Sequence, residues 1–131
     1  MRFYLAAKYD KQTDLLRIAD QLTALGHDVQ ADWLTGTHTG TSQQEARRYA
    51  DIDFGDIACC THFVLFNLPH DQPEPPIGRY IELGYAYRSG KQCIVVGGGE
   101  SVFYALMTRY ATTDAFLASL RIVQEGTDDG F

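Results

Sequence analysis

The sequence predicts an α/β protein with a flavodoxin- or Rossmann-like three-layer fold, in which a four- to five-stranded parallel sheet lies between helices. Short apolar runs alternate with longer stretches that have apolar residues at helical spacing, and this alternation is typical of a parallel sheet. The 131 residues suit one hydrophobic core. We therefore expect a single domain over residues 1–123 and a polar tail over residues 124–131.

The first part of the chain predicts a strand, a helix and a second strand. Residues 2–7 are a short apolar run, as expected of a first strand. Residues 11–25 carry leucine, isoleucine and alanine at helical spacing, and Gly26 follows as a typical residue just beyond a helix. Residues 27–34 alternate and predict a strand, and the polar residues 36–41 predict a loop.

The middle of the chain predicts a capped helix, a buried strand and a loop. Ser42 and Glu45 have the spacing of a capping box, so we expect the second helix to begin there and to run to about Cys60. Residues 63–67 are apolar and predict a strand. Residues 68–76 contain all four prolines of the chain and predict a loop.

The last part of the chain continues the alternation. Residues 77–89 predict the third helix, and residues 92–96 predict a buried strand. Residues 101–107 predict a helical stretch, and residues 108–110 a short fifth strand. Residues 114–123 predict the final helix. In such a sheet, ligands bind beyond the carboxyl ends of the strands.

Charge and cysteine content exclude several classes of function. The net charge of −6 argues against a nucleic acid polymer as the main partner, because binding to phosphates needs a basic surface. No run approaches the roughly 20 apolar residues of a membrane span. The three cysteines form neither a disulfide framework nor a zinc site at recognisable spacing. We therefore expect a cytoplasmic protein without a metal or cofactor.

One aspartate lies on an apolar stripe of the predicted second helix. The residues that share this stripe are Ala46, Ala50, Asp53, Ile57 and Cys60. A buried carboxylate is costly unless it is paired, hydrogen-bonded or functional. Helix geometry alone leaves two interpretations of Asp53 about equal, namely a functional carboxylate or a structural cap for a neighbouring backbone amide.

Glu82 lies in the first turns of the predicted third helix, at the carboxyl edge of the sheet. The positive end of a helix dipole favours an ionised carboxylate, which is the form that a nucleophile needs. The alternative is a surface glutamate that only complements the dipole. Retaining glycosyl transfer uses two carboxylates about 5 Å apart, one of which captures the sugar carbon. Asp53 and Glu82 are the candidates for such a pair.

Three segments resemble the nucleoside 2-deoxyribosyltransferase superfamily, including its nucleoside 5′-monophosphate N-glycosidase branch. They are Phe3-Tyr4-Leu5-Ala6-Ala7, the run from Asp53 to Thr61, and Gly78-Arg79-Tyr80-Ile81-Glu82-Leu83-Gly84-Tyr85-Ala86. The last segment is similar to the family's Gly-x-x-x-Glu-Leu-Gly-x-Ala box. The resemblance implies that Glu82 is the nucleophile, that Asp53 positions substrate or nucleophile, and that Tyr4 contacts them.

Further candidates for contacts to a nucleoside or nucleotide are Ala6, Lys8, Trp33, Gly78 and Gly97. The alternatives are ordinary turns at Lys8 and Gly97 and a core position for Trp33. Weaker candidates are His38, near the base, and the C-terminal Phe131, reaching a neighbouring site. Two positions depart from the family pattern. Thr61 replaces the family's second aspartate, and Pro76 stands where the transferases carry an acid that contacts the base.

The resemblance implies cleavage of an N-glycosidic bond, by hydrolysis or base transfer, in a homo-oligomer. One alternative is an NAD-type glycohydrolase that uses the same glutamate, which a product assay for nicotinamide would distinguish. Another is a non-catalytic nucleotide-binding or sensing module, which Pro76 favours and the Asp53–Glu82 pair disfavours. A phosphoacceptor domain of the same fold is disfavoured, because Lys8 and Asn67 stand where it needs acids.

Overall fold

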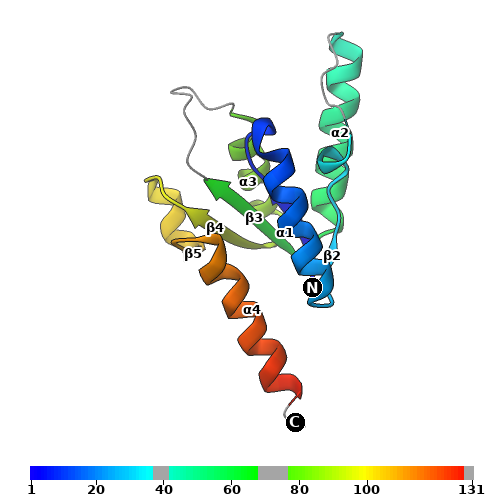
Figure 1. Cartoon of the computed structure of the whole chain (residues 1–131). Coiled ribbons are helices and arrows are strands. Elements are labelled where there is room, and N and C mark those ends of the chain that lie inside the picture. Colours follow the sequence, from blue (N-terminus) through cyan, green and yellow to red (C-terminus); the bar gives the residue numbers. More distant parts are fainter. Residues whose placement is uncertain (37–41, 68–76, 129–131) are drawn as a thin grey trace.

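The computed structural model describes residues 1–36, 42–67 and 77–128, with side chains described as far as Arg121. Its centre is a five-stranded, wholly parallel sheet with the strand order β2-β1-β3-β4-β5 (Figure 1). The strands are β1 (Arg2–Ala6), β2 (Asp28–Val29), β3 (His62–Asn67), β4 (Gln92–Gly97) and β5 (Thr108–Tyr110). This confirms the predicted fold class.

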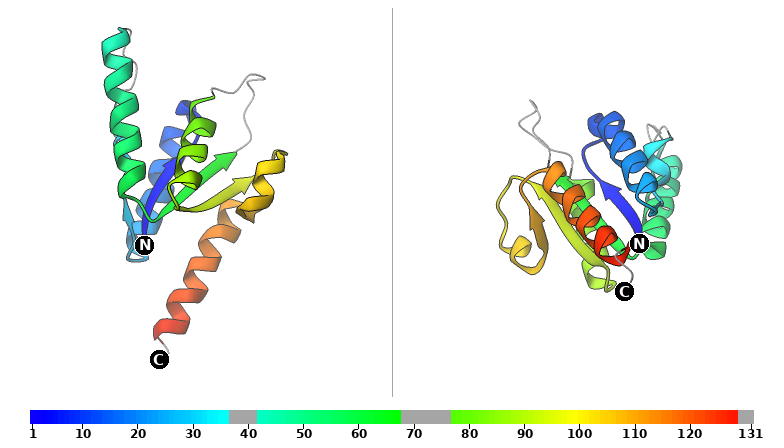
Figure 2. Two further views of the ribbon diagram at one scale, coloured as in Figure 1. Left: turned by 180° about the vertical axis from the view of Figure 1, so that it is seen from behind. Right: turned by 60° about the horizontal axis from the view of Figure 1, so that its bottom comes forward.

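Four α-helices cover the two faces of the sheet. They are α1 (Gln12–Ala24), α2 (Gln43–Cys59), α3 (Gly78–Arg88) and α4 (Thr113–Asp128). Phe3 of β1 packs edge-to-face against Phe116 of α4, while the next residue, Tyr4, reaches Glu82 of α3. Since successive side chains of a strand point to opposite faces, α4 lies on one face with α1, and α3 lies on the other with α2 (Figures 1 and 2).

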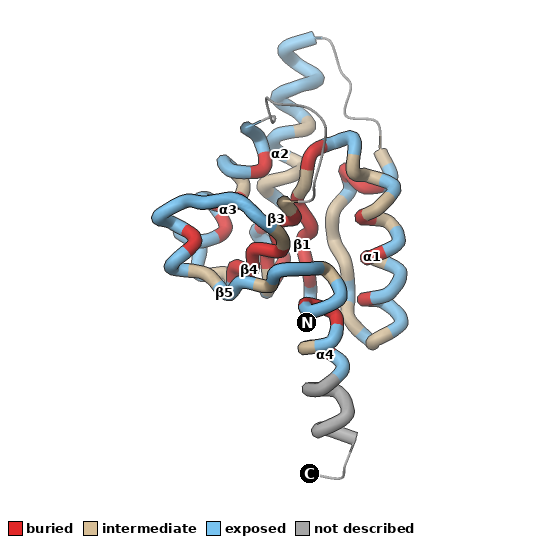
Figure 3. The backbone as a smooth tube through the Cα atoms, turned by 60° about the vertical axis from the view of Figure 1, so that its left-hand side comes forward, coloured by how far each residue is buried: buried red, intermediate tan, exposed pale blue. Residues whose placement is uncertain are grey.

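Three short 3-10 helices connect these elements. They are η1 (Tyr9–Lys11), η2 (Asp32–Leu34) and η3 (Val102–Leu106). The core lies on both faces of the three central strands, where β1, β3 and β4 are almost fully buried (Figure 3). None of the helices in the described ranges has the length and apolar character of a membrane span.

Local signals account for most of the helix ends. The Ser42 side chain accepts a hydrogen bond from the Glu45 backbone N–H at 3.1 Å, as the capping box predicts. Gly26 follows α1 with a φ of +91°, and Gly90 follows α3 with a φ of +81°. These positive φ angles suit glycine and end both helices.

Four elements differ from the sequence prediction. The strand expected over residues 27–34 is limited to β2, because the chain turns inward at η2 and buries Trp33. The stretch predicted at 101–107 is the 3-10 helix η3, and α4 continues to Asp128. The predicted stripe of α2 is buried only near its C-terminus, since Ala46 and Ala50 are exposed. The upper part of α2 extends beyond the sheet (Figures 1 and 2).

The parallel register decides which side chains lie under α2 and α3. Tyr4 is paired with Phe63, and Phe63 with Cys93, so the three side chains point to the same face. The rings of Tyr4 and Phe63 stack with centroids 5.5 Å apart. Phe63 therefore supports the Tyr4 ring from the side, and the hydroxyl extends toward α3.

Candidate active site

A hydrogen bond between the first strand and the third helix forms the centre of the candidate site. The Tyr4 hydroxyl donates to Oε2 of Glu82, although the two residues are 78 positions apart in the sequence. Tyr4 is fully buried and Glu82 is half-buried. The strand and the stacked Phe63 ring hold Tyr4 in place, so the direction of the Glu82 carboxylate is set by a rigid partner.

Burial perturbs both members of this pair. It raises the pKa of Glu82 from the ordinary 4.5 to about 7, although the hydrogen bond from Tyr4 lowers this pKa in part. The sequence leads us to expect that the helix dipole favours the ionised form of Glu82, and burial acts in the opposite direction. Glu82 is the fifth residue of α3, and the helix dipole weakens beyond the first turn. The loss of hydration outweighs the dipole, so Glu82 changes its charge near neutral pH.

Two aspartates of α2 lie near the same hydroxyl. Burial, and then the negative charges of Glu82, Asp53 and Asp56, raise the pKa of Tyr4 far above its ordinary value. Tyr4 therefore remains protonated and acts only as a hydrogen-bond donor. The structure brings Tyr4 and Glu82 into contact and places Asp53 near enough to act on the same hydroxyl. Three carboxyl groups therefore lie near one phenol hydroxyl.

Sequence reasoning did not single out Asp56 as a site residue. Its Oδ2 accepts the backbone N–H of Asp32 at 2.9 Å and so links α2 to the turn at η2. Gln12 of α1 holds the same turn through the carbonyls of Trp33, at 2.6 Å, and Gly36, at 3.0 Å. No sequence signal pairs these residues, because they come together only when α1, α2 and β2 have packed.

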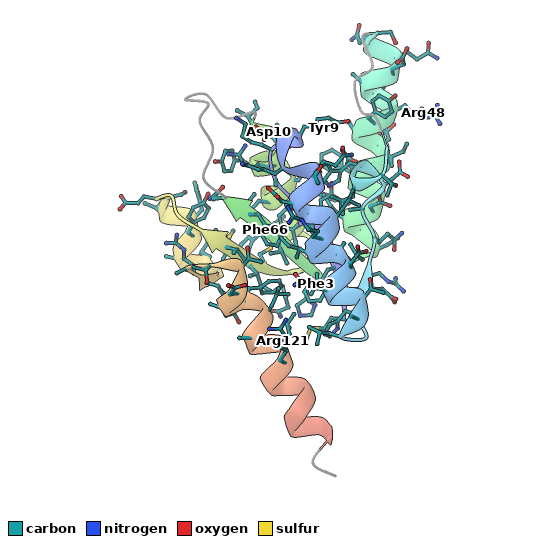
Figure 4. All side chains as sticks on the ribbon, viewed as in Figure 1. Phe3, Tyr9, Asp10, Arg48, Phe66 and Arg121 are labelled. Atoms are coloured by element: carbon teal, nitrogen blue, oxygen red, sulfur yellow. The ribbon has the colours of Figure 1, made fainter. Side chains whose placement is uncertain are left out.

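The implied substrate-binding residues lie in different environments. Trp33 is 6% exposed and donates from Nε1 to the Leu5 carbonyl at 2.8 Å, so its ring packs into the core beside β1. Ala6 is buried at the end of β1. Lys8 follows it and is 7% exposed, just before Tyr9 and Asp10 at the same edge (Figure 4). Gly78 is exposed at the start of α3.

Gly97 lies on the opposite flank of α3 from Glu82. It lines an open cavity of about 1250 Å³ between α3 and η3, which we call the α3–η3 hollow. Among the residues that line the hollow are Arg79, Tyr80, Tyr87, Gly97, Phe103 and Leu106. Gly97 has a φ of +104°, and a Cβ there would lie 2.4 Å from the Asn67 carbonyl oxygen. This position therefore requires glycine for backbone reasons alone.

The hollow and the charged pair are separate features of the molecule. Neither Tyr4 nor Glu82 lines the hollow, because they face α2 across the other flank of α3.

Within the described ranges, no group of three or more His, Cys, Asp or Glu side chains is suited to hold a metal ion. His38, Pro76 and Phe131 lie outside the described residues. The contacts expected of His38 and Phe131, and the missing base contact at Pro76, therefore stay predictions.

Comparisons with known proteins place the fold. Comparison of the sequence with protein-family models and with curated proteins finds no match. Among solved structures, the CMP N-glycosidase of Clostridium botulinum superposes with a TM-score of 0.59 at 19% identity, over 92% of this chain and 99% of that one. The 2-deoxyribosyltransferase of Bacillus psychrosaccharolyticus superposes with a TM-score of 0.70 at 17% identity, over 92% of this chain and 96% of that one.

A third solved structure is more distant. The 2-deoxyribosyltransferase of Leishmania mexicana has a TM-score of 0.54 at 15% identity, over 80% of this chain and 69% of that one. At these identities the likeness concerns the arrangement of the backbone. Along almost its whole length, the chain has the fold of an N-glycosidase and of 2-deoxyribosyltransferases, as the sequence resemblance implies.

Proposed function

We propose that this protein cleaves the N-glycosidic bond of a nucleoside or nucleoside 5′-monophosphate, with Glu82 as the nucleophile. The observation that carries the proposal is the hydrogen bond from buried Tyr4 to Glu82, next to Asp53. A half-buried carboxylate that is directed by a fixed donor is suited to attack a carbon that develops positive charge. The fold shared with an N-glycosidase and with 2-deoxyribosyltransferases supports the same reaction class.

The electrostatics of the site favour an oxocarbenium-like transition state. Glu82 and the two α2 carboxylates Asp53 and Asp56 lie close enough to act together on Tyr4. A positive charge at the sugar C1′ carbon would be stabilised by this negative field, in a site partly shielded from water. Simple binding of a neutral sugar does not require such a field, so catalysis fits the arrangement better than a sensing role does.

The proposed reaction has two steps. Ionised Glu82 attacks C1′ while the base leaves with the electrons of the C–N bond and takes up a proton. Water, or a second base, then attacks C1′ and releases the carboxylate. Tyr4 keeps the reacting oxygen in position, and Asp53 orients the sugar or the nucleophile. Because Glu82 must be ionised, the rate is expected to rise with pH through about 7.

A product assay tests this proposal. The protein is incubated with a mixed pool of nucleosides and 5′-monophosphates, and with NAD, and the free bases are separated by chromatography. We expect Glu82→Ala to lower base release at least ~1000-fold, while Glu82→Gln still binds the substrate. Release of nicotinamide alone would replace the proposal with the NAD glycohydrolase alternative.

The matched control is Glu100→Gln, which removes a carboxylate on the opposite flank of α3. It should retain base release at the wild-type rate. A 2′-fluorinated substrate adds a second readout, because it is expected to leave a glycosyl group on the peptide that contains Glu82. Full activity of Glu82→Ala would rule out the nucleophile assignment.

A further inference from the structure

An aromatic contact joins the two helices that carry the candidate carboxyl groups. Phe54 of α2 and Tyr85 of α3 pack with their ring centroids 4.7 Å apart and an interplanar angle of 56°. We call the line along which α2 lies against α3 the α2–α3 seam. Because one ring comes from each helix, the contact fixes how far apart α2 and α3 lie at this level of the seam.

The two rings lie deeper in the seam than the carboxyl groups. Both helices begin beyond the carboxyl ends of the strands and run toward the amino ends (Figure 1). Tyr85 follows Glu82 by three residues, so it lies about 4.5 Å further along the axis, on a neighbouring position of the same side of α3. Phe54 directly follows Asp53 on α2. A substrate that enters from the carboxyl edge would therefore meet the carboxyl groups first and the rings behind them.

The aromatic contact spans the depth of the seam from the core to the surface. Phe54 is partly buried and packs against the core, while Tyr85 is 36% exposed. On the sheet side, the stacked rings of Tyr4 and Phe63 support Glu82. Glu82 thus has aromatic rings toward the sheet and toward the amino ends of the strands, and both sets restrict the approach of water.

We propose that Phe54 and Tyr85 are positioning residues, whose contact holds α2 and α3 at the separation that the proposed reaction needs and keeps water out of the seam behind Glu82. Neither ring has to touch the substrate for this role. The inference rests on the proposed function for the reaction that it serves. Its effect on Glu82 can be measured without any substrate, so the two proposals can fail separately.

Water exclusion links this contact to the protonation of Glu82. Burial is the main cause that raises the pKa of Glu82 to about 7. The titratable groups that face this region are Tyr4 of β1 and the α2 residues Asp53 and Asp56. Cys93 of β4 points to the same face, and burial raises its pKa to about 11, so it stays neutral. If a ring is removed, water enters the seam and favours the ionised carboxylate, so the pKa of Glu82 should fall.

NMR titration of the full chain tests this effect directly. The glutamate side-chain carboxyl carbons are labelled with carbon-13, and Glu82→Gln identifies the Glu82 signal. We expect a wild-type midpoint at about pH 7, and midpoints lower by at least ~1 pH unit in Phe54→Ala and Tyr85→Ala. Tyr85→Phe keeps the ring and should keep the midpoint. Tyr87→Ala is the matched control, because Tyr87 is an exposed tyrosine of α3 on the flank toward η3.

Kinetics on a substrate that the wild type cleaves test the positioning role. At a pH where Glu82 is ionised in every variant, Phe54→Ala and Tyr85→Ala should each lower kcat by ~10-fold, with KM within ~2-fold of the wild type. The double variant should lose little more than either single variant, because the two rings act as one contact. A purely structural role would instead leave kcat and the midpoint unchanged in the folded variants.

Circular dichroism should show that the variants keep the wild-type helix content. If an alanine variant loses it, Phe54→Leu and Tyr85→Leu replace the alanine variants, and they should move the midpoint in the same direction. Wild-type midpoints in folded variants of both positions would overturn the inference. A wild type that released no base would overturn the proposed function, while the NMR midpoints would still decide whether the two rings exclude water from Glu82.

Discussion

The two flanks of α3 differ in nearly every physical respect. The flank toward α2 presents Glu82 to Tyr4, with two aspartates nearby. The flank toward η3 opens into a hollow of about 1250 Å³ with aromatic and aliphatic walls. The first flank gathers carboxyl groups around a buried hydroxyl. The second flank borders a cavity whose charged lining residues are Arg79 and Glu100.

This difference shows that a large cavity and the residues with perturbed pKa values can lie in different parts of a protein. The largest apolar pocket is the usual first hypothesis for an active site. Here the perturbed carboxyl group lies elsewhere, and burial keeps the pKa of Glu82 near neutrality. A perturbed pKa with an identified partner is a stronger sign of catalysis than an apolar cavity.

Among variants that keep Glu82, the largest expected effect comes from removing the hydrogen-bond donor, Tyr4. Tyr4→Phe should reduce base release by ~100-fold, or about 2.7 kcal/mol of transition-state stabilisation. It should also move the acid limb of the pH–rate profile above 7, because the Tyr4 hydrogen bond lowers the pKa of Glu82 in the wild type. Measurement of kcat/KM from pH 5 to pH 9 gives both quantities.

Tyr104→Phe is the matched control on the other flank. The Tyr104 hydroxyl accepts a hydrogen bond from Asn67 Nδ2 at 3.0 Å and lines the α3–η3 hollow. Its loss should leave the acid limb at the wild-type pH. If both variants moved the limb equally, the two flanks would be electrostatically coupled and the contrast between them would be wrong.

The sequence was sufficient to predict the secondary elements that have local signals. Ser42 and Glu45 encode their own cap, and Gly26 and Gly90 end helices through their positive φ angles. The second strand was overestimated, because the turn at η2 depends on the burial of Trp33 against β1. Alternation of apolar and polar residues cannot show that a side chain folds back into the core.

The candidate site was predictable only in part. Helix periodicity and the motif resemblance led to Asp53 and Glu82, and the opening segment led to Tyr4. The size of the rise in the pKa of Glu82 depends on how much water the packed helices exclude, which no sequence pattern shows. Asp56 had no signal, since its partner is a backbone amide 24 residues away.

An effect of intermediate size is expected for the free energy of unfolding when Glu82 is replaced. A carboxyl group whose pKa is raised from 4.5 to about 7 stays protonated in the folded chain while it ionises in the unfolded chain. Its contribution to stability is fully present below pH 4.5 and is lost as the pH rises to about 7. Glu82→Gln cannot ionise, so it should be more stable than the wild type at pH 8, by about 1–3 kcal/mol.

Urea unfolding at pH 4.5 and pH 8 measures this difference. The stability advantage of Glu82→Gln should grow as the pH rises from 4.5 to about 7 and should stay constant at higher pH. Glu45→Gln is the control, because it makes the same substitution at an exposed position of α2 and should lack the stability advantage of Glu82→Gln at pH 8. Parallel curves for the wild type and Glu82→Gln would mean that Glu82 is hydrated, and that the charged flank of α3 resembles an ordinary surface.

The smallest expected effect separates the charge of Asp56 from its hydrogen bond. An asparagine oxygen can still accept the backbone N–H of Asp32, so Asp56→Asn should change the free energy of unfolding by less than ~0.5 kcal/mol. Asp56→Ala removes the acceptor and should cost about 1–2 kcal/mol, with faster hydrogen exchange at the Asp32 amide.

If the negative field of α2 assists catalysis, both variants lower kcat while only the alanine variant loosens the turn. Equal kcat for the wild type and Asp56→Asn would limit Asp56 to holding the turn, and Glu82 and Asp53 would then supply the charge of this flank.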